Sequence, residues 1–285
     1  MMIEGEVLMD KNSLVNIDLQ PIADVSNNLI DKLANGIGWL ATPRGNKAQQ
    51  IEAQNYLIEQ IKNDENMPPL EKAASISNAK KILKEYANQN DIYNGAMNFL
   101  SEKENLELVD KVDDDWLEFF FDKAKGISRD EMKIIWSKLL AKEVVSPDSI
   151  SKQLLHILTV IDHKEACSFA KLADYCIKAD GKDVVVLYNE MLSEIYKDDR
   201  LVVEELFRLQ DIGLVQYSVA GYTYSRETDE ELTYFGKEIE TNIGEVFFVG
   251  SVLLSRAGEE LMSILTERNE VEGLYELLNE KYKMK

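Results

Sequence analysis

Apolar side chains recur at helical spacing through about the first 210 residues, and strand-like segments follow only after that point. A repeat of about 3.6 residues indicates amphipathic helices, whereas alternation and short apolar runs indicate strands. The clearest helical stripe comprises Met132, Ile135, Trp136, Leu139 and Leu140. The pattern predicts a mainly α protein with a smaller α+β part near its C-terminal end.

We expect three regions along the chain. These are an N-terminal helical region over residues 1–105, a central helical domain over residues 106–161, and a C-terminal winged-helix-like α+β domain over residues 162–285. Helices come first in this order and mixed structure last.

The winged-helix expectation depends on the order of the elements in the third region. Helical patterns cover residues 166–177, 184–195 and 202–209, and strand-like segments follow at residues 214–217 and 222–224. An Ala-Gly pair between the two strands indicates a hairpin turn. Three helices followed by a hairpin are typical of a winged helix.

Short polar motifs predict where several helices begin. The acidic residues 113–115 precede an apolar helical stripe, and a helix N-terminus favours negative charge. Ser128 and Glu131 have the spacing of a capping box, and residues 162–165 indicate another helix start.

A related pattern occurs twice near the end of the chain. Residues 232–239 and 254–261 both read Leu, then Thr or Ser, then a Gly three residues later, and each ends on Glu and an aliphatic residue. In each case the Thr or Ser is expected to cap a helix that follows a strand.

Charge is the strongest global constraint on partners. The 285 residues include 32 basic and 52 acidic side chains, which gives a net charge of −20, and residues 1–150 and 151–285 carry −9 and −11. Nucleic-acid binding depends on basic groups that displace counterions, so nucleic acid is an unfavoured partner. A protein partner is favoured, and self-association stays open.

The sequence also bears on location. Its apolar runs are shorter than the ~18 to 20 residues of a membrane-spanning helix, and its acidic start lacks a basic signal-peptide region. Two cysteines are too few for a disulfide framework, so a reducing cytoplasm is expected.

Motifs of known chemistry nominate no reaction. His156 is expected on the face opposite the apolar stripe of its helix and His163 in a helix start, which favours solvated or capping roles over metal ligation. Cys176 is expected to be a small buried hydrophobe. We therefore expect no catalytic residue, no cofactor and no metal site, although an enzyme without a recognisable motif stays an alternative.

A glycine-containing segment around residues 36–47 offers candidate interaction residues. Its spacing matches no standard phosphate-binding loop, so a turn between helices is expected. Trp39 and Leu40 lie beside this turn and could anchor a partner. The alternative is that both pack against the chain's own helices.

One charged residue departs from its local pattern. Glu143 follows Trp136, Leu139 and Leu140 at helical spacing, which turns its carboxylate toward the buried face. A buried carboxylate needs donors, and the start of the next helix could supply them. We expect a structural role for Glu143 rather than a catalytic one.

Three motifs carry a family resemblance. Residues 113–120, 128–132 and 136–143 resemble a bacterial family of uncharacterised proteins related to the abortive-infection alpha proteins. The resemblance implies a contribution to antiphage defence, and it carries over no catalytic residue, cofactor or substrate.

Two functions follow from these observations. The first is a non-enzymatic protein-interaction component of an antiphage, abortive-infection-like defence system. The alternative is a winged-helix transcriptional regulator, although the expected recognition helix carries more acidic than basic side chains.

Overall fold

The computed structural model describes residues 28–34, 47–100, 106–188, 203–228, 230–241 and 246–283. Residues 28–34 are helical. The labelled helices are α2 (Lys47–Asn63), α3 (Pro69–Phe99), the 3₁₀ helix η1 (Leu106–Lys111), α4 (Asp114–Ala124), α5 (Asp130–Val145), α6 (Lys152–Val160), α7 (His163–Ala173), α9 (Val203–Asp211), α10 (Arg256–Met262) and α11 (Leu274–Lys283). The strands are β1 (Cys176–Ala179), β2 (Lys182–Val185), β3 (Val215–Ser225), β4 (Thr233–Tyr234), β5 (Lys237–Glu238) and β6 (Val246–Leu254).

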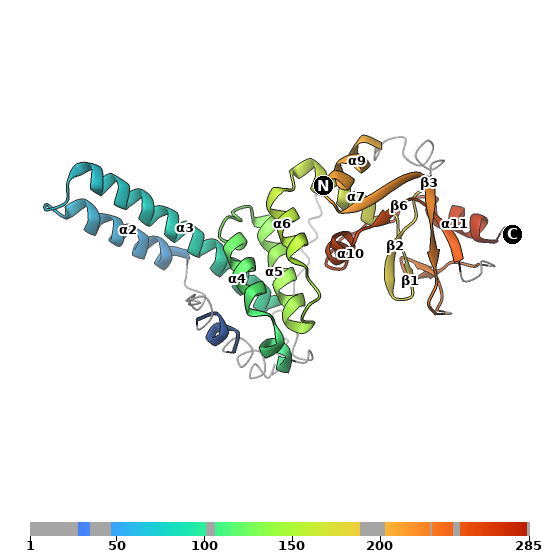
Figure 1. The fold of residues 1–285 in the computed structure, drawn as a ribbon, viewed down its shortest axis with the longest axis horizontal. Coiled ribbons are helices and arrows are strands. Elements are labelled where there is room, and N and C mark those ends of the chain that lie inside the picture. Colours follow the sequence, from blue (N-terminus) through green and yellow to red (C-terminus); the bar gives the residue numbers. More distant parts are fainter. Residues whose placement is uncertain are drawn as a thin grey trace, which may run out of the picture.

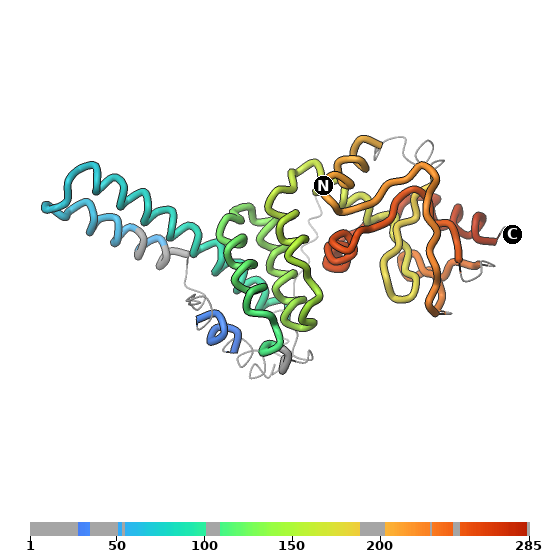
Figure 2. The backbone as a smooth tube through the Cα atoms, in the orientation of Figure 1, coloured from blue at the N-terminus to red at the C-terminus, as the bar shows by residue number. Residues whose placement is uncertain are grey.

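The described part of the chain is elongated (Figure 1). Helices α2 and α3 lie antiparallel and project from one side, α4 to α6 form the centre, and the strands lie at the opposite end (Figure 2). The prediction of a mainly α protein with a smaller α+β part is therefore confirmed, and the strands of that part are antiparallel.

The central helices pack around a group of aromatic side chains. Asp113 caps α4, because its carboxylate accepts a hydrogen bond from the Trp116 backbone N–H at 2.7 Å. Trp116 stacks on Phe120, and Phe120 contacts Trp136, each at 5.0 Å between ring centroids. All three rings are buried, so the apolar stripes of α4 and α5 face each other.

Two further predicted helix caps are present, and the one at Ser128 is wrong. Asp162 and Glu165 form the capping box of α7, and Ser255 caps α10 by accepting from the Gly258 N–H at 3.0 Å. Ser128 does not cap α5, because that helix begins at Asp130 after the N-cap residue Arg129. Acidic side chains in its first turn favour this start through the helix dipole.

The strands form two antiparallel sheets. One has the order β2-β1-β4-β5, and the other pairs β3 with β6. Leu187, just after β2, connects the two sheets: its N–H donates to the Val249 oxygen at 3.0 Å, and its oxygen accepts from the Ser251 N–H at 2.7 Å.

The hairpin expected at residues 214–224 is not formed. These residues belong to one strand, β3, which pairs with β6 and contains an irregularity between Tyr217 and Tyr222. Gly221 has a φ of +78° there, and a Cβ on it would lie 2.3 Å from the Phe248 ring. The Ala-Gly pair therefore marks a bulge against an aromatic ring rather than a reversal of the chain.

Three segments expected to be helical contain strands. Residues 176–177 begin β1 and residues 182–185 form β2, joined by a turn in which Asp180 and Gly181 both have positive φ. The first expected capped helix, at residues 232–239, is instead the β4–β5 hairpin.

Among the helices that the structure describes, none has both the length and the apolar character needed to cross a membrane.

Candidate functional site

A cleft lies between α5 and the segment that ends α10. The face of α5 that carries Trp136 and Leu139 is buried in the core, and Lys138 and Lys142 extend instead toward α10, one helical turn apart. The cleft thus joins the central helices to the part of the chain that contains the sheets.

The ammonium groups of both lysines donate hydrogen bonds to hydroxyl or carbonyl oxygens. The Lys138 Nζ donates to Thr266 Oγ1 at 3.0 Å and to the Ile264 carbonyl oxygen at 3.4 Å. The Lys142 Nζ donates to Ser263 Oγ. Among the residues described, neither ammonium group has a carboxylate within ion-pair distance, unlike Lys133 and Lys178.

The cleft is open to solvent and has a volume of about 480 Å³. Its polar wall consists of Lys138, Lys142, Ser146, Ser263 and Thr266. The volume lies within the range of pockets that hold small organic molecules.

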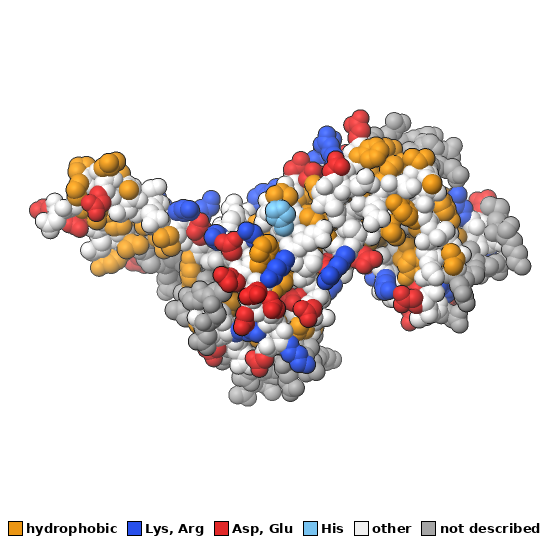
Figure 3. Space-filling model, in the orientation of Figure 1, with side chains coloured by type: hydrophobic (Ala, Val, Ile, Leu, Met, Phe, Trp, Pro, Cys, Tyr) orange, Lys and Arg blue, Asp and Glu red, His pale blue; other side chains and the backbone are white. Residues whose placement is uncertain are grey.

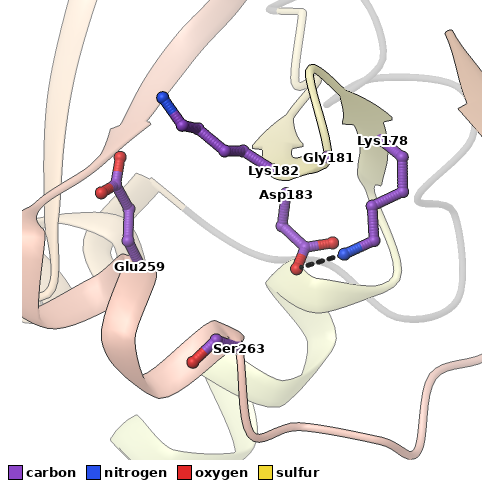
Figure 4. A pocket seen from close by; sticks show the side chains of 6 residues that line it. All are labelled: Lys178, Gly181, Lys182, Asp183, Glu259 and Ser263. Carbon is purple, nitrogen blue, oxygen red and sulfur yellow. Dashed lines mark hydrogen bonds and ion pairs between the residues drawn. The ribbon is translucent and has the colours of Figure 1, made fainter. Parts of the chain in front are cut away.

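A second, smaller pocket of about 280 Å³ adjoins the first, and Ser263 lines both. Figure 4 shows Lys182 and Glu259 on opposite walls of this pocket and the Ser263 side chain below them. Asp183 is occupied by its own partners, Lys178 at 3.0 Å and Arg268 at 2.7 Å.

The electrostatics of the two pockets differ. Burial acts to raise the pKa of Asp183, but the hydrogen bonds from Arg268 and Lys178 outweigh it and lower the pKa. Burial lowers the pKa of Lys142, and the nearby Glu260 and Asp183 carboxylates only partly compensate. The second pocket therefore holds a satisfied ion-pair network, while the ammonium of Lys142 is incompletely compensated.

Two buried glutamates fix the walls of the cleft. Glu143 is 1% exposed, and its carboxylate accepts from the backbone N–H of Asp148 at 2.7 Å and of Ile150 at 2.9 Å. Glu260 is 8% exposed and accepts from the Ser151 N–H at 2.8 Å and the Ser151 hydroxyl at 2.7 Å. Together they attach the α5–α6 connection to both α5 and α10.

Burial raises the pKa of Glu143, and the backbone hydrogen bonds from Asp148 and Ile150 only partly oppose that shift. The carboxylate lies on the buried face that the helical spacing predicts, and its donors come from the start of the next helix. The geometry gives Glu143 a role in holding this loop.

The α2–α3 pair forms a second candidate site, which we call the arm (residues 47–87). Of the arm side chains that the structure describes, only Ile58 is buried. Large apolar side chains of the arm are exposed, and Figure 3 shows hydrophobic surface on this projection. These exposed residues are Ile51, Tyr56, Leu57, Leu70 and Ile82.

The remaining candidate residues are dispersed. Trp39 and Leu40 lie outside the described residues.

The histidines and Cys176 do not come together in the structure. His156 and His163 are exposed. Burial raises the pKa of the Cys176 thiol to about 12. Cys176 is buried as expected, although it begins strand β1 rather than lying on a helix. No group of three or more metal-ligating side chains occurs among the described residues.

Comparison with known proteins gives one match. The family model described as "Protein of unknown function (DUF2806)" matches residues 75–278. No curated protein and no solved structure matches the chain. The matched range contains most of α3 and both walls of the cleft, and it excludes α2.

Proposed function

The chain belongs to the DUF2806 family, a family of unknown function, and from its geometry we propose that it is a non-enzymatic protein-interaction component of bacterial antiphage defence. The observation that carries the interaction part is the arm. The resemblance of residues 113–120, 128–132 and 136–143 to relatives of the abortive-infection alpha proteins supports the defence part.

The arm has the properties of a partner-binding surface. Leu70 is 84% exposed and Tyr56 is 67% exposed, although these side chains stabilise a protein most when they are buried. The buried side chains of α3 begin only at Asn88, so most of the helix has no core of its own chain to pack on. Large exposed apolar side chains that cluster on one projection are typical of protein-binding sites.

Charge favours the same surface. The arm contains six basic and six acidic side chains, whereas the whole chain has a net charge of −20. An acidic protein partner is repelled by the body of this chain but not by a neutral arm. The arm is therefore the part of the molecule that such a partner can approach most closely.

Two arm substitutions test the proposed surface. We expect Tyr56→Ser combined with Leu70→Ser to remove the proteins that the native chain captures from infected or uninfected bacteria. Both side chains are exposed, so the fold should be retained. The measurement is quantitative mass spectrometry of affinity-captured proteins.

Val160→Ser is the matched control, because Val160 is 60% exposed but lies at the end of α6, outside the arm. It should capture the same proteins as the native chain. If the double arm variant captures the same proteins in the same amounts, the arm is not the partner surface.

A winged-helix transcriptional regulator has less support. Its recognition helix would be α9, where Arg208 stands against Glu204, Glu205 and Asp211. The hairpin that would form the wing is absent from residues 214–224, which lie in β3. Too few basic groups are available there for counterion release.

We expect only weak or undetectable binding to nucleic acid. The measurement is a titration of labelled duplex DNA and single-stranded RNA at low salt, where electrostatic binding is strongest. Specific, salt-sensitive binding at nanomolar protein would overturn the interaction-protein proposal and favour the regulator.

A further inference from the structure

The α5–α10 cleft contains two lysines that the described carboxylates leave without an ion-pair partner. The chain has 52 acidic side chains against 32 basic ones, so carboxylates that could pair with a lysine are abundant. Lys133, on the same helix, pairs with Asp91 at 2.6 Å. Lys138 and Lys142 instead meet only neutral oxygen atoms within hydrogen-bond distance.

These neutral contacts arrange a site for an anion. The lysine side chains are one turn apart on α5, and the hydroxyl groups of Ser263 and Thr266 face them from the segment that ends α10. Lysine binds phosphate as a compact positive charge, and the Thr266 hydroxyl can donate to a remaining phosphate oxygen. The Ser263 hydroxyl already donates to the Glu260 carbonyl oxygen at 2.5 Å, so it only borders the site. The burial that lowers the pKa of Lys142 also strengthens its attraction to an anion in the cleft.

The other wall of the same cavity is apolar. It consists of Phe99, Ala141, Val145 and Ile264. Phe99 is 45% exposed at the end of α3, and the Lys138 Nζ lies 5.8 Å from the centre of its ring. A phosphate at Lys138 would therefore stand close to an exposed aromatic face, on which a flat ring can stack.

We propose that this cleft binds a nucleoside monophosphate, with its phosphate between Lys138, Lys142, Ser263 and Thr266 and its base against Phe99. The cavity of about 480 Å³ is large enough for such a molecule. Glu143 and Glu260 hold the two walls together through the α5–α6 connection, so the site is largely formed before the ligand arrives.

Calorimetric titration of the full chain with AMP tests the site, with GMP, CMP and UMP as further probes. We expect at least one of the four to bind with a Kd below about 1 mM. Lys138→Met and Lys142→Met should each weaken that binding about tenfold or more, because each removes the ammonium group while keeping most of the apolar length of the side chain. Lys152→Met, an exposed lysine at the start of α6, should bind like the native chain.

Inorganic phosphate separates the contribution of the phosphate-binding side of the cleft from that of Phe99. Inorganic phosphate should bind more weakly than the nucleotide, and Phe99→Leu should weaken nucleotide binding while leaving phosphate binding unchanged. Thermal melts of each variant report whether it is folded. The proposal is wrong if no nucleotide binds, if folded lysine variants bind as tightly as the native chain, or if phosphate alone binds as tightly as the nucleotide.

Discussion

A Gly250→Ala substitution should lower the free energy of unfolding by about 2 to 6 kcal/mol, the sum of backbone strain and overpacking. Gly250 has a φ of +107°, and a Cβ there would lie 2.0 Å from the Leu187 carbonyl oxygen. The obstacle is backbone, so it cannot rotate away as a side chain would. Because Leu187 joins the two sheets, we expect the substitution to loosen the whole C-terminal part of the fold.

Gly236→Ala is the control that separates the cost of backbone strain from the cost of a steric clash. Gly236 has a φ of +74° in the β4–β5 turn, and a Cβ there would have no neighbour within 4 Å. It should therefore cost only the conformational strain, about 1 to 2 kcal/mol. Urea unfolding curves of both variants measure the difference, and equal losses of stability would contradict the close packing of Leu187 on Gly250.

A Glu143→Ala substitution should lower the free energy of unfolding by about 1 to 3 kcal/mol, because it leaves buried donors unpaired. The N–H groups of Asp148 and Ile150 would lose their acceptor. Asp148 also has a φ of +66°, so the loop that the carboxylate holds is conformationally strained. Loss of this anchor should release the α5–α6 connection.

Glu118→Ala is the matched control, since Glu118 is an exposed carboxylate on α4. Its effect should stay within about 0.5 kcal/mol. Denaturant melts decide whether Glu143 has a structural role or a role in a functional site. Unchanged stability of Glu143→Ala, combined with loss of biological activity, would show that Glu143 works in a site instead.

Local chemistry accounts for the parts of the fold that were predicted correctly. The cap at Asp113 and the capping box of Asp162 and Glu165 need only residues within one turn of the helix start. The stripe of α5 likewise depends on spacing within a single helix, and it places Trp136 and Glu143 in the core. Such short-range features are visible in the sequence because no distant contact changes them.

Distant contacts explain why one pattern gives two structures. Residues 232–239 form a hairpin and residues 254–261 begin a helix, although both segments share a Leu, a Thr or Ser, a Gly, a Glu and a final aliphatic residue at corresponding positions. Gly236 adopts a positive φ in open space, whereas a Cβ on Gly258 would lie 2.0 Å from the Leu214 oxygen. Close packing of Gly258 on Leu214, the residue before β3, accompanies the helix there, and the positions that the two segments share do not contain this information.

The β1–β2 hairpin has a turn signal in its sequence, although the neighbouring apolar spacing favours a helix. Asp180 and Gly181 form a dipeptide that favours a two-residue turn with positive φ at both positions. The Asp180 carboxylate also accepts from the Thr228 N–H at 3.0 Å and the Glu227 N–H at 2.9 Å, and these bonds lower its pKa to about 2. The sequence pattern instead predicts a helix over residues 166–177, because the apolar residues before Gly181 also fit helical spacing.

The cleft could not be predicted from the sequence. Lysines four residues apart on a helix are typical of a solvated face, so Lys138 and Lys142 carry no distinguishing signal. Their partners, Ser263 and Thr266, lie more than 120 residues away in the sequence. Only the folded chain brings these four side chains together.

Efficiency of plating in a phage-sensitive host tests the proposed function most directly. The chain is expressed with its neighbouring genes and compared with the Tyr56→Ser, Leu70→Ser double variant, with Val160→Ser, and with an empty vector. We expect the native chain and Val160→Ser to reduce plaque counts, and the double variant to give the counts of the empty vector. No protection by the native chain against a broad phage panel would contradict the defence proposal, and full protection by the folded double variant would contradict the role of the arm.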